Sequence, residues 1–297
     1  MNGALWVDLT LNGALIGGVW ALLGLGKNLV LGTMRFVNFA HANFALVGMY
    51  LTYFLWHAWR INPYLILPVT AVATFVLGLV LDRPFARPLM MRGQRAQILA
   101  TWGVAIILQY GASAWFGADT RSIQSSWNTS GFHIGSVIFV SKTALVNGFL
   151  SAAIVFATVG LINHTTFGLR LRAMSQNRDA AVYKGIDVNR EFGYGFALTL
   201  SLAGVVGGLL EITTPVDPQA TVPLFLLMFV VSVLGGLGSM LGNLLGGIAV
   251  GLMQGYTTMV LPAQLENMVV YIVFLLVLLF RPQGILGRID VIRQGPL

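Results

Sequence analysis

Several ionisable and amide side chains lie inside long apolar stretches of this 297-residue sequence. A Lys or Asp at the centre of a membrane-spanning helix costs roughly 2.5–3.5 kcal/mol on insertion scales. Side chains at such positions therefore indicate either a route for a polar solute or a structural role within the membrane. The candidates for a solute pathway are Lys27, Asn38, His41, Asn43, Gln109 and Glu211.

Each candidate also has a structural alternative. Lys27 would either attract a solute carboxylate or extend to the cytoplasmic interface near Arg35. Asn38 and His41 are three residues apart, so they are expected to share one helix face, where they would contact solute or bond the backbone of a broken helix. Glu211 is expected at an outer mouth, as a solute contact or as a solvated loop charge.

A second polar feature is the segment 165–191, which is far more polar than its surroundings. Its residues from Arg172 to Lys184 predict one short amphipathic helix, and Gly185 predicts where that helix ends. A membrane protein without a soluble domain has little internal use for such a helix. We therefore expect it to dock onto a cytoplasmic partner; the alternative is a solvated loop that only sets the topology.

The composition requires a membrane around the elements that position these residues. The chain is 57% hydrophobic and 9% charged, whereas soluble domains carry roughly 25% charged residues. We expect an all-α polytopic membrane protein, with residues 1–297 forming a single transmembrane domain of eight or nine segments, one of them re-entrant or broken. The expected spans are 9–31, 36–57, 64–81, 97–117, 143–162, 191–212, 222–240, 242–262 and 264–280.

The basic residues predict the orientation of these spans. Twelve of the seventeen Lys and Arg residues lie in 82–95, in 163–190 or from 281 onward, and short basic loops face the cytoplasm. The loop 118–142 and the N-terminus are then outside. The net charge of +7 is explained by this topology, so we expect no nucleic-acid partner.

Glycines recur at four-residue spacing in the C-terminal third, at Gly238, Gly242 and Gly246. This spacing places small residues on one helix face, where two backbones can approach closely. We interpret the spacing as helix packing; the functional alternative is a seam with a second membrane chain or a lining of the pathway. The stretch 235–247 is expected to be a loop or a break inside the membrane.

The polar segment carries a family resemblance. Asp179, Ala180, Ala181 and Gly185 form D-A-A-x-x-x-G, which resembles the EAA signature of permeases of ATP-binding cassette (ABC) importers, with Asp in place of Glu. Other stretches resemble the LivH-like permeases of branched-chain amino acid importers, although Ala42 and Asn43 replace that family's Gly-Glu pair. These stretches are V-N-F-A-H-A-N-F at 37–44, G-L-R-L-R-A at 168–173, G-G-L-G-S at 235–239 and L-F-R-P-Q-G-I-L-G-R at 279–288.

The resemblance implies a permease subunit of the bacterial inner membrane that carries branched-chain amino acids or a related small polar solute inward. It implies a second related permease chain, two ATP-binding subunits and a periplasmic solute-binding protein, with ATP and Mg held by the ATP-binding subunits and no cofactor in this chain. It also implies that segment 165–190 is the coupling-helix loop. The residues assigned to coupling are Arg172, Ala173, Asn177, Asp179, Ala180, Ala181 and Gly185.

Other classes of protein fit less well. Gly26-Lys27-Asn28 is not a P-loop, because Ala21 replaces the first Gly and Asn28 the Ser or Thr, so we expect no ATPase activity in this chain. The absence of Cys and the scattered His residues predict no metal site. Ser239 lies in G-L-G-S-M, which does not match a serine-protease elbow. The remaining alternative is a stand-alone ion-coupled secondary transporter.

Overall fold

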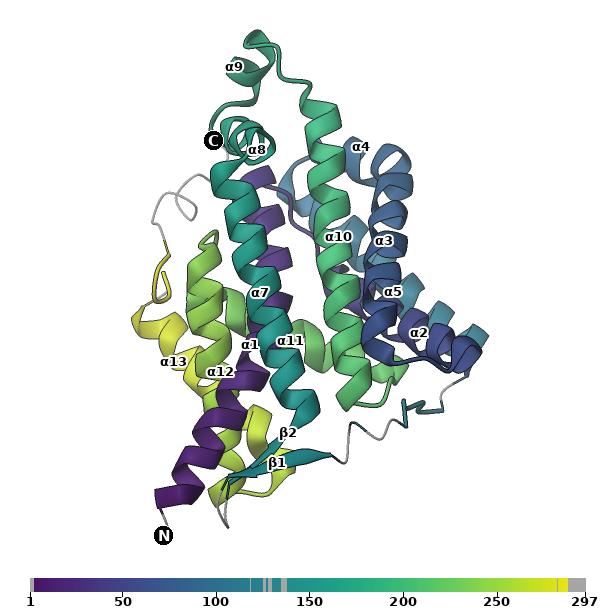
Figure 1. Ribbon diagram of the computed structural model, residues 1–297. Helices are drawn as coiled ribbons and strands as arrows, with labels where there is room; N and C mark the ends of the chain where they lie inside the picture. The colour runs from purple at the N-terminus through teal and green to yellow at the C-terminus, as the bar shows by residue number, and fades with distance from the viewer. Residues whose placement is uncertain are drawn as a thin grey trace. The chain divides into compact units, whose positions relative to one another are not determined.

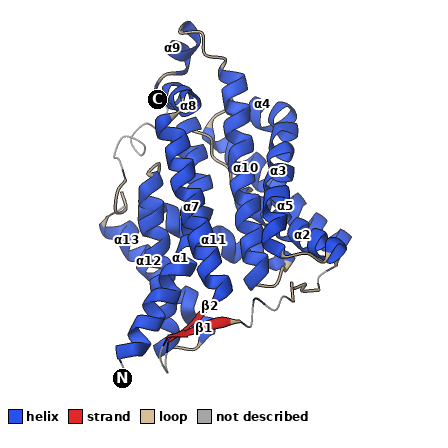
Figure 2. Cartoon of the chain, in the orientation of Figure 1, coloured by secondary structure: helices blue, strands red, loops and turns tan. Residues whose placement is uncertain are grey.

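The computed structural model describes residues 3–117, 119–124, 127, 130–134, 138–281 and 283–287, and most of them are helical (Figure 2). The basic residues Arg288 and Arg293, which the topology prediction used, lie outside these residues. The helices are α1 (Gly3–Met34), α2 (His41–Trp59), α3 (Pro63–Leu81), α4 (Arg87–Met90), α5 (Gln94–Phe116), α7 (Lys142–His164), α8 (Thr166–Gln176), α9 (Arg178–Tyr183), α10 (Val188–Thr213), α11 (Thr221–Gly235), α12 (Met240–Val260) and α13 (Glu266–Phe280). The π-helix η1 (Asp82–Ala86) and the 3-10 helices η2 (Pro218–Ala220) and η3 (Ala263–Leu265) complete the helical elements.

An antiparallel hairpin, β1 (Gly131–Ile134) and β2 (Ile138–Ser141), departs from the all-α expectation. Gly131 pairs with Ser141, and Phe132 pairs with Val140. The hairpin is fixed to α1, because the Phe139 N–H donates to Asp8 Oδ1 at 3.0 Å. Two strands alone are marginally stable in water, so this contact with a long helix contributes to the stability of the hairpin.

Five helical stretches within the described residues are long and apolar enough to cross a membrane. The expected eight or nine spans are not confirmed by this criterion: α11 and α12 qualify only as a pair bent by 120°, and α13 is shorter. The helix α2 is not among the five, because polar side chains such as His41 and Asn43 reduce its hydropathy. The five stretches are Leu5–Met34, Pro63–Met90, Gln94–Phe116, Lys142–His164 and Val188–Thr213.

Contacts between Cα atoms divide the chain into two compact units. One unit comprises residues 1–25, 124–156 and 227–297, and it contains the hairpin with α12 and α13. The other comprises 26–123 and 157–226, and it contains α2 to α5 with α8 to α10. In this second unit α8 and α9 lie at the N-terminal end of α10 (Figure 1).

The second unit is built around α10, which packs along both α2 and α3. Glycines permit this close packing, because a Cβ on Gly78 would lie 2.5 Å from the Cα of Ala197. A Cβ on Gly48 would likewise overlap the backbone of Gly204. Small residues thus bring the three helices into backbone contact, and α10 is closely packed against both α2 and α3.

The first unit also contains a sharp break, at residues 236–239 between α11 and α12, as the glycine-rich composition predicts. Gly236 and Gly238 have φ of 103° and 81°, a conformation that favours glycine. The C-terminal end of α11 is capped by later residues, since Ile285 N–H donates to Leu234 O at 2.8 Å and Leu286 N–H to Gly235 O at 3.1 Å. Residues 283–287 therefore hold the break in place.

Candidate functional site

The basic segment between α7 and α10 is a chain of capped turns. Thr165 Oγ1 accepts from the Gly168 N–H at 3.2 Å and begins α8. Asn177 Oδ1 accepts from the Ala180 N–H at 2.9 Å and begins α9. Asp187 Oδ1 accepts from the Arg190 N–H at 3.1 Å and begins α10. Each cap satisfies a helical N–H that lacks a partner, so the sequence itself determines where each helix starts.

The prediction of one helix from Arg172 to Lys184 is wrong, because the segment forms two helices separated at Asn177. Asn177 is extended, with φ −152° and ψ 113°, and its side chain caps α9 instead of continuing α8. Asn is favoured as an N-cap because its side chain competes for backbone donors. This preference was the signal in the sequence that the prediction overlooked.

The predicted end at Gly185 agrees with the structure. Gly185 has φ +77°, its N–H donates to Val182 O at 2.9 Å, and the Ile186 N–H donates to Ala181 O at 3.0 Å. This pair of bonds is a Schellman motif, which terminates a helix with a left-handed glycine. A Cβ on Gly185 would meet no atom within 4 Å, so only the backbone conformation requires glycine here.

The exposed surface of α9 differs from the prediction. Ala181 is only 4% exposed, so it packs inside this chain and its side chain does not face a partner. Ala180 and Asp179 are exposed, and so are the apolar side chains of Val182 and Tyr183, at 55% and 89%. The sequence analysis did not select Val182 and Tyr183, although two apolar residues within a polar segment were a visible signal.

The remaining residues assigned to coupling lie on α8 or next to α9. Arg172 donates from Nη2 to Asn163 O at 3.2 Å, which ties α8 to the end of α7. Ala173 is partly buried on α8, and its carbonyl accepts from the Asn177 N–H at 3.2 Å. Arg178, which was not assigned to coupling, donates to Met91 Sδ at 3.1 Å. Partial burial lowers the pKa of the Arg178 guanidinium, while neighbouring Asp179 opposes that shift, and the group stays charged.

Five of the six polar residues expected along a solute pathway are buried, and the exception is Gln109. Lys27 is 6% exposed, so it does not extend to an aqueous interface as the structural alternative required. His41 is 1% exposed. Its ring packs against Gly26, because a Cβ on Gly26 would lie 2.6 Å from His41 Nε2, and Gly26 is the residue before Lys27. Neither ring nitrogen of His41 makes a hydrogen bond within the described part of the chain.

Asn38 and Asn43 hold the backbone together. Asn38 precedes α2, so it does not share a helix face with His41 as predicted, and its Oδ1 accepts from the Ala40 N–H at 3.0 Å. Asn43 donates to Ala105 O at 2.9 Å and so joins α2 to α5. The structural alternative, in which a polar side chain bonds the backbone at a broken helix, describes Asn38.

Glu211 lies near the C-terminal end of α10, and Gln109 lies in the C-terminal half of α5. The two side chains differ in burial. Glu211, close to the end of α10, is 1% exposed, so it is not a solvated loop charge. Gln109 on α5 donates to Gln219 Oε1 at 3.3 Å in an exposed position. Glu211 therefore remains a pathway candidate, whereas Gln109 joins α5 to η2.

The glycine pattern is only partly helical. Gly238 lies in the break before α12, so it cannot share a helix face with Gly242 and Gly246 as predicted. Gly242 and Gly246 pack against α11, since a Cβ on Gly246 would lie 2.6 Å from Val231 O. Their role in this structure is packing within the chain.

The same helix, α12, contains buried polar residues that the sequence analysis did not select. Asn243 is 0% exposed, and neither polar atom of its side chain has a hydrogen bond within the described residues. Gln254 accepts from Trp20 Nε1 at 2.8 Å and donates to Asn267 Oδ1 at 2.9 Å, which links α1, α12 and α13. A polar residue inside an apolar span was the same signal that selected Asn43.

Long apolar helices, buried polar residues and a capped basic segment together define a multi-pass membrane protein of the transporter class. The chain belongs to the family of permease components of branched-chain amino acid transport systems, which matches residues 9–278. The stand-alone secondary transporter is therefore not supported. The family accounts for nearly the whole chain, including the segment from α8 to α10.

Individual relatives agree with this assignment. The chain is 30% identical to the probable branched-chain amino acid transport permease protein LivH of Methanocaldococcus jannaschii, over 94% of this chain and 92% of that protein. It is 25% identical to the high-affinity permease LivH of Escherichia coli K12, over 94% and 95%. It is also 25% identical to the permease BraD of Pseudomonas aeruginosa, over 96% and 97%.

A solved structure supports the fold alone. The chain matches a chain of PsaBC from Streptococcus pneumoniae in complex with Fab, with a TM-score of 0.50 over 94% of this chain and 92% of the other. The sequences are 12% identical.

Proposed function

We propose that this chain is the transmembrane permease subunit of an ABC importer that moves branched-chain amino acids, or a related small polar solute, into the cytoplasm. ATP hydrolysis in partner subunits drives the transport. The proposal is supported by membership of the permease family and by the relatives' names. The observation that carries it is the exposed apolar surface of α9, formed by Val182 and Tyr183, in a segment outside the long apolar helices.

We also propose the partners and the location. The chain pairs with a second related permease, two ATP-binding subunits and a periplasmic solute-binding protein in the bacterial inner membrane. ATP and Mg bind to the ATP-binding subunits, and this chain needs no cofactor of its own. These proposals are supported by the family, whose name describes one component of a transport system.

The proposed topology has nine membrane segments: α1, α2, α3, α5, α7, α10, α11, α12 and α13. In this topology α8 and α9 lie in the cytoplasm and the hairpin of β1 and β2 lies outside, as the basic residues in the loops predict. The helices α11 and α13 have 15 residues each, below the roughly 17–25 residues of a typical span, so we expect them to be short or tilted segments.

Two buried residues form the proposed core of the solute pathway. Lys27 supplies a positive charge for the solute carboxylate, and His41, which packs beside the same part of α1, supplies ring nitrogens with no hydrogen bond among the described residues. Glu211 supplies a carboxylate for a solute ammonium group toward the other end of α10. An amino acid carries both charges, so each of these side chains complements one of them at a different point along the pathway.

The test of the proposed function is docking to an ATP-binding subunit through α9. Ala180→Arg places a long cation on the exposed face of α9, and it should reduce co-purification of the ATP-binding subunits and abolish ATP-dependent uptake. Asn189→Arg is the matched control, because Asn189 is exposed on the first turn of α10, next to Arg190. Uptake in vesicles lacking any ATP-binding subunit would refute the proposal.

A further inference from the structure

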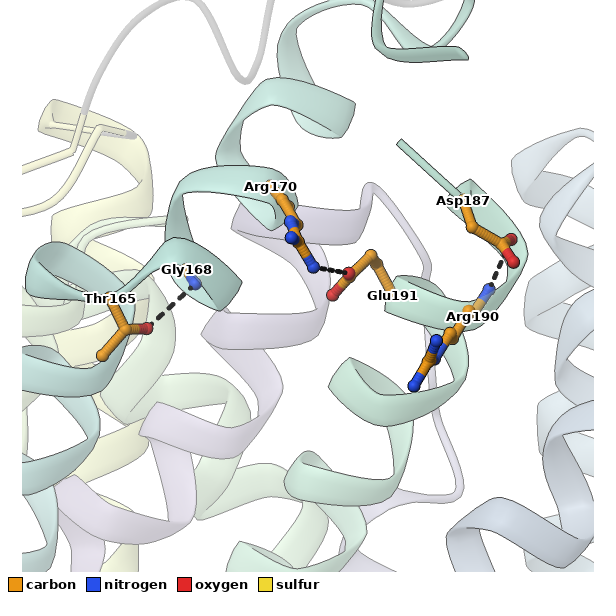
Figure 3. Close-up of polar contacts among 6 residues, drawn as sticks. All are labelled: Thr165, Gly168, Arg170, Asp187, Arg190 and Glu191. Carbon is orange, nitrogen blue, oxygen red and sulfur yellow. Dashed lines mark hydrogen bonds and ion pairs between the residues drawn. The ribbon is translucent and has the colours of Figure 1, made fainter. Parts of the chain in front are cut away.

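Glu191 is a buried carboxylate at the N-terminal end of α10. Its side chain is 8% exposed, and its Oε1 accepts from Arg170 Nη1 on α8 at 2.8 Å (Figure 3). Arg170 reaches it from a side chain that is 53% exposed. A buried carboxylate requires a charged partner or several hydrogen bonds, so this pair differs from ordinary surface pairs, whose contribution is small.

The ion pair is reinforced by an apolar contact one helical turn further along α10. Leu171, the residue after Arg170, is 0% exposed. A Cβ on Gly195 would lie 3.2 Å from Leu171 Cδ2, so the absence of a side chain there leaves room for Leu171. Glu191 and Gly195 are four residues apart and share a helix face. The helix α8 is therefore held to α10 by a charged contact and a packed contact side by side.

A second buried carboxylate lies close to the same end of α10 and is paired separately. Asp82 Oδ2 would lie 2.6 Å from a Cβ on Gly193, and the Asp82 side chain is 4% exposed. Its ion-pair partner is Arg87, five residues further along the chain. Asp82 is thus paired with Arg87, and Glu191 is paired with Arg170. Of the two arginines, only Arg170 lies on α8, the helix that precedes α9.

The α9 surface is joined to the rest of the second unit by α8, by the contact of Arg178 with Met91, and by residues 184–187, which lead into α10. Val182 and Tyr183 are exposed, whereas α8 is anchored by Arg170 and Leu171. The backbone continues from α8 into α9 through two bonds at Asn177, whose N–H donates to Ala173 O at 3.2 Å and whose carbonyl accepts from Ala181 N–H at 3.1 Å. A displacement of α9 by a partner would consequently act on α10 in two ways, through residues 184–187 and, by way of α8, at Glu191.

We propose that Arg170 and Glu191 are positioning residues, whose ion pair transmits movement of α8 and α9 to α10 during transport. This inference rests on the proposed function, in which α9 docks on an ATP-binding subunit. Since α10 is packed along both α2 and α3, a displacement of its N-terminal end shifts three helices together. Without the ion pair, α9 would still dock, but hydrolysis and transport would be uncoupled.

The experiment compares the reconstituted importer carrying Arg170→Gln, Glu191→Gln or the exchange of both residues, Arg170→Glu with Glu191→Arg. We expect each single variant to co-purify with the ATP-binding subunits while the solute transported per ATP hydrolysed falls at least about fivefold, the lower range of allosteric coupling. The exchange should restore part of that ratio. Arg190→Gln, at an exposed neighbouring position, is the control and should leave the ratio unchanged.

Three results would overturn the inference: single variants with the wild-type ratio, an exchange no better than either single variant, or single variants that no longer co-purify. The last result would mean that the pair shapes the docking surface instead of transmitting movement. If Glu191→Gln does not assemble, Arg170→Lys, which retains the charge, is compared with Arg170→Gln, and equal ratios would contradict the proposal. Failure of the unmodified chain to bind any ATP-binding subunit would instead refute the proposed function.

Discussion

Replacing Gly185 tests whether the turn between α9 and α10 must be left-handed. Gly185 has φ +77° and an open surrounding, because a Cβ would meet no atom within 4 Å. The expected penalty is therefore conformational only, and a residue with a Cβ in this region costs roughly 1–2 kcal/mol. Since 1.4 kcal/mol corresponds to a factor of ten, the population of the native turn should fall about 5- to 30-fold relative to alternatives.

The size of the effect should follow the side chain. Asn tolerates the left-handed region better than Ala, and a β-branched residue tolerates it least. We expect ATP-dependent uptake to decrease in the order Gly185, Gly185→Asn, Gly185→Ala, Gly185→Val, while the amount of inserted protein stays constant. The assay is uptake by reconstituted importer, normalised to the permease content of each preparation.

A matched control separates backbone strain from the loss of a glycine. Gly103 on α5 also has open space around it, but its φ is not positive. Gly103→Ala should therefore leave uptake unchanged, because Ala is favoured over Gly within a helix. Wild-type uptake by Gly185→Val, or equal loss with Asn and Val, would refute the reasoning.

Three further predictions concern topology, the solute pathway and packing. Cysteine at Thr120 should react with a membrane-impermeant thiol reagent in intact cells, whereas cysteine at Ser175 should be protected; the reverse pattern would invert the topology. Lys27→Met should impair uptake without loss of assembly, and unchanged uptake would exclude Lys27 from the pathway. Gly17→Leu should reduce the yield of folded protein, measured by size-exclusion chromatography, because even a Cβ there would lie 2.7 Å from Gly247 O. Gly255→Ala, with its nearest neighbour at 3.3 Å, should give a yield close to that of the wild type.

The positions of the apolar helices could be predicted well, because hydrophobic runs and helix caps are local. The predicted span 64–81 corresponds to α3, Pro63–Leu81, where Asn62 caps the first turn and Pro63 occupies a position that needs no N–H. The predicted span 36–57 began too early, since residues 35–40 are not helical. Periodicity alone could not show that Asn38 would bond the backbone in that gap.

Long-range contacts could not be predicted from the sequence in the same way. Arg170 and Glu191 are separated by 21 residues. Arg170 lies in the first half of α8 and Glu191 in the first turn of α10, and nothing in the local sequence around either residue indicates that the two side chains form a pair. The burial of Ala181 also depends on how α9 folds back, which the break at Asn177 determines. The hairpin of β1 and β2 escaped prediction because its strands have four residues each.

The first unit combines residues from the start and the end of the chain, so some of its packing partners are synthesised long after others. Its early helix α1 packs on late helix α12: a Cβ on Gly13 would lie 2.9 Å from Gly251 O, just as Gly17 faces Gly247. About 230 residues separate these partners, so at 5–20 residues per second the ribosome needs roughly 10 to 50 seconds to supply the second helix. During that interval α1 stays in the membrane with its glycine face uncovered, and lipids or the insertion machinery must cover it. A chain interrupted before α12 would keep this glycine face without its partner helix.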